Sequence, residues 1–69
     1  MSSTEFKLRK LLEDATFFIK NAEEDETYRE KSRICLDEAD KILLENTRES
    51  YLSLSAEVIV HLAEVSLLS

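Results

Sequence analysis

Glu57, His61 and Glu64 form the pattern in this sequence that comes nearest to a metal site. Their spacing of four and then three residues puts the side chains on one face of a helix, where two carboxylates and an imidazole could share a divalent metal. Di-iron sites in helical bundles need an acidic residue followed three positions later by histidine, on each of two helices. Here the order is reversed, and the chain has a single histidine. We therefore expect no metal, and a solvated polar strip in which the two glutamates pair loosely with His61.

Cys35 is the only cysteine and so the only candidate thiol nucleophile. A catalytic thiol needs an exposed, electropositive surrounding and a neighbouring base. Cys35 lies in the apolar stripe of its own segment, and His61 belongs to the polar strip of another. We expect Cys35 to act as a small buried hydrophobic residue. The sequence therefore predicts no catalytic residue, no enzyme activity and no cofactor.

The acidic run at residues 23–26 is a third candidate for chemistry. It lacks the ligand spacing and the central glycine of a calcium-binding loop. A surface that imitates nucleic-acid phosphates would need acidic groups across one whole face, but basic residues are interspersed with the acidic ones. These are Lys7, Arg9, Lys10, Lys20, Arg29, Lys31 and Arg33. Four like charges at the C-terminal end of a helix disfavour its continuation, so residues 23–26 are predicted to form a loop.

The amino-acid composition limits partners and location. The 15 acidic residues exceed the nine basic ones and give a net charge of −6, which would repel nucleic acid. A single cysteine cannot form an intramolecular disulfide, and the N-terminus lacks a signal-peptide pattern, so we expect a reducing, cytoplasmic location. The most apolar stretch, residues 52–68, is interrupted by Glu57, His61 and Glu64, which argues against a membrane-spanning helix.

The chain contains neither glycine nor proline. These two residues supply most tight turns and strand ends, so their absence predicts helices joined by short loops. Apolar residues recur with helical spacing in three segments, at about residues 4–22, 27–46 and 49–68. We predict a single all-α domain over residues 1–69, folded as a three-helix, up-down-up antiparallel bundle.

Local signals indicate where these helices begin and end. Ser2 or Ser3 would cap the first helix. Thr27 and Glu30 would form a capping box at the second. Asn46-Thr47 is the only break available before the third helix. Without glycine at this point, the second and third helices could instead fuse into one helix of about 40 residues, and the protein would be a long helical hairpin.

The third predicted helix is apolar on two sides. One stripe has the spacing of a core-facing helix and consists of Tyr51, Leu54, Val58, Leu62 and Val65. A second stripe, which we call the outer stripe, lies roughly 140° around the helix and consists of Leu52, Ala56, Ile59, Ala63 and Leu67. Its two alanines would let another helix approach near the lower end of the usual spacing of about 8–10 Å. We predict that the outer stripe forms a homodimer. Alternatively, the third helix is the central helix of a monomer, covered on both sides.

Phe6 and Phe17 lie off the core face of the first predicted helix. They are eleven residues apart, on nearly the same side, and roughly 16 Å apart along the axis. Large aromatic residues beside charged ones are typical of interface hot spots, so we expect both to anchor a protein partner. Alternatively, Phe6 folds over an end of the bundle and Phe17 packs against the acidic loop or the third helix. Ile34 and Leu44 also lie off the core face of their helix and would extend an interface.

These patterns favour a small, non-enzymatic helical protein that self-associates and acts as an interaction or regulatory module. Its interface would combine the outer stripe with Phe6 and Phe17. The alternative is an acidic inhibitor or antitoxin-like protein that covers the basic surface of a nucleic-acid-handling partner. Salt would weaken that electrostatic binding but would leave an apolar homodimer largely unaffected.

Overall fold

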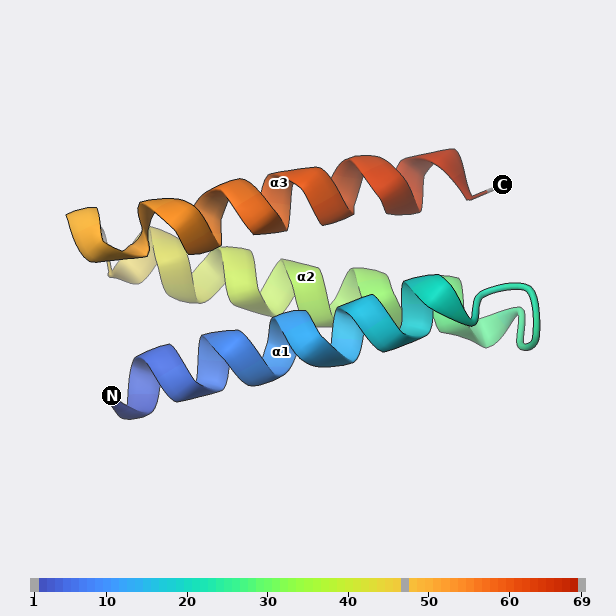
Figure 1. Cartoon of the computed structure of the whole chain (residues 1–69), viewed down its shortest axis with the longest axis horizontal. Helices are drawn as coiled ribbons and strands as arrows, with labels where there is room; N and C mark the ends of the chain where they lie inside the picture. Colours follow the sequence, from blue (N-terminus) through green and yellow to red (C-terminus); the bar gives the residue numbers. More distant parts are fainter. Residues whose placement is uncertain (1, 47, 69) are drawn as a thin grey trace.

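A computed structural model describes residues 2–46 and 48–68 and contains three α-helices that pack side by side (Figure 1). The helices are α1 (Ser3–Lys20), α2 (Thr27–Glu45) and α3 (Leu52–Leu67), and a short 3₁₀ turn, η1 (Glu49–Tyr51), comes directly before α3. No strand occurs among the residues described. The prediction of an all-α protein with three helices is therefore confirmed. Because α2 and α3 are separate helices, the alternative of a fused helical hairpin is wrong.

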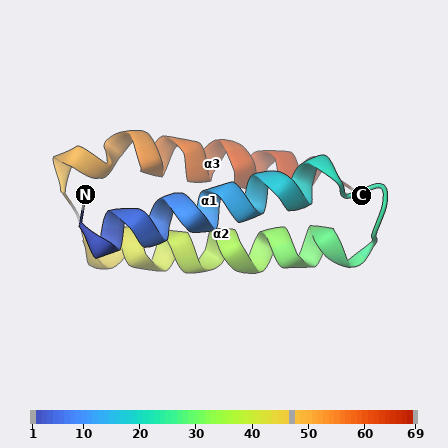
Figure 2. The same ribbon diagram turned by 60° about the horizontal axis from the view of Figure 1, so that its bottom comes forward.

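The helices form an elongated bundle of 35 × 19 × 15 Å. The N-terminus and the α2–α3 connection lie at one end of it, whereas the α1–α2 turn and the C-terminus lie at the other (Figures 1 and 2). The contact between α1 and α2 is the most extensive, and α3 packs against both. Within residues 2–46 and 48–68, no helix is both long and apolar enough to cross a membrane.

Both ends of α1 are stabilised by polar side chains. The Ser2 hydroxyl accepts a hydrogen bond from the backbone N–H of Glu5 at 3.1 Å, which confirms Ser2 as the N-cap. At the other end, the backbone N–H and the side-chain amide of Asn21 both donate to the Phe17 carbonyl, at 3.1 and 2.8 Å. Asn21 thus ends α1 at Lys20, two residues earlier than predicted. Ala22 consequently lies in the turn.

Asp25 caps the start of α2. Its carboxylate accepts hydrogen bonds from the backbone N–H and the hydroxyl of Thr27, at 2.8 and 2.6 Å. The hydroxyl bond and then the backbone bond favour the charged form, so they hold the pKa of Asp25 below its ordinary value. The predicted capping box is wrong, because Thr27 donates to a preceding carboxylate. Residues 23–26 lie in the turn, as predicted.

The connection between α2 and α3 contains no left-handed residue among those described. Asn46 ends α2 with φ −130° and ψ 70°, and its side-chain amide donates to the Ile42 carbonyl at 2.9 Å. Arg48 is extended, with φ −104° and ψ 143°, and its carbonyl accepts from the Tyr51 N–H, which closes the 3₁₀ turn. The predicted break is confirmed at Asn46, and Thr47 lies outside the described residues. The α-helix begins at Leu52, three residues later than position 49.

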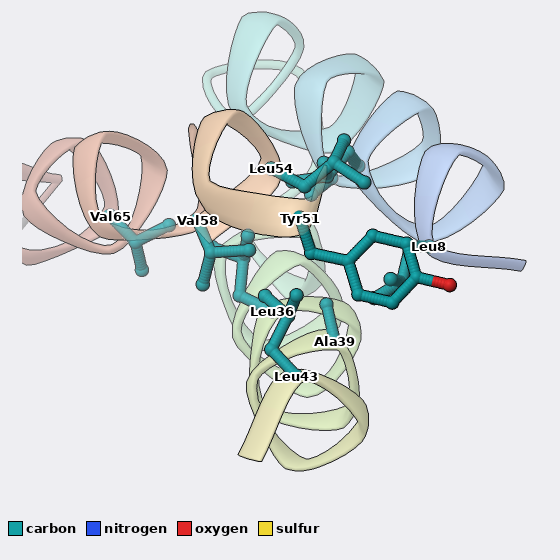
Figure 3. Packing of buried hydrophobic residues seen from close by; sticks show 10 residues of the cluster. Leu8, Leu36, Ala39, Leu43, Tyr51, Leu54, Val58 and Val65 are labelled. Carbon is teal, nitrogen blue, oxygen red and sulfur yellow. The ribbon is translucent and has the colours of Figure 1, made fainter. Parts of the chain in front are cut away.

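One apolar core joins the three helices. Figure 3 shows Leu8 from α1, Leu36 from α2 and Leu54 from α3 converging on it, with the Tyr51 ring beside Leu8. The buried apolar residues are Leu8, Leu12, Ala15, Leu36, Ala39, Leu43, Tyr51, Leu54, Val58 and Val65. Ser32 is also fully buried, and its hydroxyl donates to the Arg29 carbonyl at 2.7 Å, so this polar group costs little. The predicted core stripe of α3 therefore faces the core.

Replacing Leu36 with alanine is expected to lower the free energy of unfolding by about 2–5 kcal/mol, because the change removes a fully buried side chain and leaves a cavity. That loss is comparable to the whole stability of a domain this small, about 3–5 kcal/mol. Urea unfolding followed by circular dichroism measures it. The control is Ile34→Ala on the same helix, where the side chain is 57% exposed and the expected change is below about 0.5 kcal/mol. Equal losses in the two variants would contradict this account of the core.

Candidate interaction surface

The outer stripe of α3 faces solvent along the whole helix. The exposed fractions of Leu52, Ile59 and Leu67 are 65%, 67% and 83%, and Ala56 and Ala63 are exposed between them. Val60, which was not assigned to the stripe from the sequence, is 57% exposed. Helix α3 is thus a side of the bundle rather than its central helix, and the alternative of a covered helix is wrong. Contiguous apolar surface of this kind is typical of interaction sites.

A shallow groove of about 500 Å³ lies where the end of α2 meets the start of α3. Its apolar lining comes from Leu43, Leu44, Tyr51, Leu52 and Ile59. Two of these residues, Leu52 and Ile59, belong to the outer stripe, so the stripe and the groove form one continuous apolar surface. Leu44 is 72% exposed and extends this surface onto α2. The charged side chains of Asp40, Arg48 and Glu49 line the same groove.

His61 links α3 to α1. The Thr16 hydroxyl donates to the Leu12 carbonyl at 2.8 Å, so its oxygen accepts from His61 Nε2 at 3.2 Å. The Glu64 carboxylate accepts from His61 Nδ1 at 2.8 Å. The prediction of a loose, solvated strip is therefore wrong for His61, whose side chain is only 20% exposed. Thr16 was missed in the sequence, although its place between Leu12 and the core side of α1 was a usable signal.

A metal ion would have to displace these hydrogen bonds, because both ring nitrogens of His61 already have partners. Among residues 2–46 and 48–68, no three His, Cys, Asp or Glu side chains are grouped so that they could hold a metal ion.

Phe6 and Phe17 are both exposed on α1, by 64% and 54%. The Phe17 ring lies 5.7 Å from the Phe18 ring and 5.9 Å from the Tyr28 ring, measured between centroids. The Lys31 ammonium lies 5.3 Å from the centre of the Tyr28 ring and adds a cation–π contact. Phe17 thus belongs to a surface aromatic cluster at the α1–α2 turn. The structure does not bring this cluster into the α2–α3 groove, whose lining it does not share.

The Cys35 thiol is half-buried on α2. Burial raises the pKa of this thiol above its ordinary value, and the negative charges of Asp14 and Glu38 raise it further. The thiol therefore remains protonated near neutral pH, which is the opposite of what a nucleophile requires.

Replacing both Phe6 and Phe17 with alanine is expected to cost less than about 2 kcal/mol of unfolding free energy, because only the Phe17 ring has aromatic neighbours and both side chains are exposed. Thermal unfolding measures this. A loss of about 3–5 kcal/mol, as expected for core phenylalanines, would assign both residues to the core instead.

Alkylation of Cys35 by iodoacetamide at pH 8 is expected to be slower than alkylation of glutathione, because a raised pKa leaves less thiolate at that pH. The substitution Asp14→Asn removes one of the charges that raise the pKa, so it should increase the rate. In denaturant the rate should approach that of a free thiol. A native rate equal to that of glutathione would refute the protonated, half-buried thiol.

The comparisons with known proteins leave this surface to be interpreted from its own residues. No protein-family model, no curated protein and no solved structure matches the chain.

Proposed function

We propose that this protein is a non-enzymatic interaction module in which up-down-up antiparallel bundles self-associate as dimers through the outer stripe of α3. A single observation carries the proposal. Three large apolar side chains, Leu52, Ile59 and Leu67, stand at least 65% exposed on one face of a helix whose opposite face fills the core. Burying such a side chain contributes about 1.5–3 kcal/mol, so leaving three of them in water is costly.

The size of the chain supports the same conclusion. A domain of 69 residues has a small core, and proteins of this length commonly gain stability from a disulfide, a metal or association. The only cysteine is a free thiol with a raised pKa, and the only histidine is occupied by Thr16 and Glu64. Association through an apolar face is the means that the described residues favour.

The surface suits a helix as its partner. Ala56 and Ala63 are small and exposed at the middle of the outer stripe, so a second helix could approach to about 8 Å between axes. Larger side chains at Leu52 and Leu67 would then pack on either side of this close contact. Recognition of this kind uses apolar anchors at helical spacing and needs no enzyme chemistry. Phe6 and Phe17 would serve as a second contact area for a further protein partner.

The alternative, an acidic protein that inhibits a basic, nucleic-acid-handling partner, has less support. Lys7, Lys10 and Arg33 each lie within 4 Å of a carboxylate, in ion pairs with Glu38, Asp14 and Asp37. Positive charge is therefore interspersed among the acidic groups on α1 and α2. A surface that competes with nucleic acid would need its carboxylates on a face without such cations.

Substituting glutamate for Ile59 is expected to abolish self-association, because the charge would be buried without a partner at the centre of the stripe. Analytical ultracentrifugation over a range of concentrations measures this, with a shift from dimer to monomer expected. Ile34→Glu is the matched control: the same substitution at a similarly exposed isoleucine, 57% against 67%, on α2.

Two outcomes would refute the proposal. One is a wild-type protein that stays monomeric at high concentration, and the other is an Ile59→Glu variant that associates as well as Ile34→Glu. Capture of a basic protein that is lost in high salt would favour the acidic inhibitor instead.

A further inference from the structure

The exposed apolar residues of α3 are arranged symmetrically along the helix. With Val60 included, the outer face reads Leu52, Ala56, Ile59, Val60, Ala63 and Leu67. Leu52 and Leu67 are equally far from the midpoint between Ile59 and Val60, and so are the two alanines. At about 100° per residue, all six side chains fall within about 50° of one direction. Read from either end, the face therefore presents a leucine, an alanine, two β-branched residues, an alanine and a leucine.

We infer that α3 pairs antiparallel with α3 of a second copy of this chain, about a two-fold axis between Ile59 and Val60. The inference rests on the proposed self-association and specifies its geometry. In a two-fold dimer, residue i contacts residue j and residue j contacts residue i. Antiparallel pairing then places Leu52 against Leu67, and Ala56 against Ala63, of the other copy. Large residues meet large ones and small residues meet small ones, which a face without this symmetry would not achieve.

Charge complementarity favours the same orientation. The last turn of α3 has no basic residue to offset the negative end of its helix dipole. Arg48 is exposed just before α3, in the lining of the groove. Antiparallel pairing brings the last turn of the second copy to this end, so Arg48 faces the partner's unpaired carbonyl groups. Parallel pairing would instead place Arg48 beside its own copy and align two helix dipoles side by side.

One electrostatic term opposes the pairing. Glu57 and Glu64 lie on the edge of α3 that also carries His61. A two-fold axis across the helices keeps this edge on the same side in both copies, so Glu57 lies near Glu64 of the other copy. Repulsion between exposed carboxylates is weak in water and is screened by salt, whereas apolar burial is not. The antiparallel dimer should therefore become tighter as salt increases.

Disulfide trapping tests the orientation. In a Cys35→Ser background, Ala56→Cys and Ala63→Cys are made as separate chains, one of them with a tag, and are oxidised alone and mixed. Antiparallel pairing predicts that the mixed disulfide forms at least about tenfold faster than either self-disulfide, because facing Cα atoms of closely packed helices lie within disulfide range. Leu52→Cys and Leu67→Cys repeat the test at the ends of the helix. Circular dichroism checks that each exposed-site variant is folded.

The outcomes separate the two proposals. Faster self-disulfides, or a dimer that forms neither disulfide, would overturn the antiparallel pairing and leave self-association intact. A reduced protein that sediments as a monomer would overturn both. Tighter association in 0.5 M than in about 0.05 M sodium chloride is expected, and a loss of association with salt would contradict the placement of the two glutamates.

Discussion

The close contact between α1 and α2 determines what α3 can do. Three small side chains on these helices, Ala15, Ser32 and Ala39, are completely buried, so the two backbones can approach closely and form the most extensive contact in the bundle. Because α1 and α2 cover each other, α3 can pack only along one side of the pair. Leu54 and Val58 fill that contact. No part of the described chain is left to cover the other side of α3.

Polar contacts then fix the rotation of α3 about its own axis. The hydrogen bond between Thr16 and His61 ties one edge of the helix to α1. At the start of α3, the buried Tyr51 ring closes the core, and its hydroxyl lies 3.4 Å from the Ser2 hydroxyl. A helix with two apolar sides could satisfy its core with either one. These contacts select the side that is buried and thereby direct Ile59 and its neighbours outward.

Apolar burial rather than ion pairing stabilises this bundle and would stabilise its dimer. The pairs of Arg9 with Glu5, and of Lys10 with Asp14, are exposed and lie within one turn of a single helix. Such pairs contribute at most about 1 kcal/mol each, and salt screens them. The single ion pair between α1 and α2 among those described, Lys7 with Glu38, is also exposed. Charge therefore adjusts affinity and orientation, as Arg48 does in the proposed dimer, while the outer stripe supplies the attraction.

The sequence by itself determined the elements and their faces. Helical spacing and the lack of glycine and proline predicted the three helices, and the apolar pattern separated the buried face of α3 from its exposed one, because both are properties of a single helix. Helix ends were less predictable, since Asn21 and Asp25 act through hydrogen bonds that compete with other capping residues. Only the tertiary structure decided that α3 is a side of the bundle and not its centre, that His61 bonds to Thr16, and that Leu44 joins Leu52 at a groove. Each of these depends on which helices are neighbours, and the periodicity of one helix carries no information about the position of another.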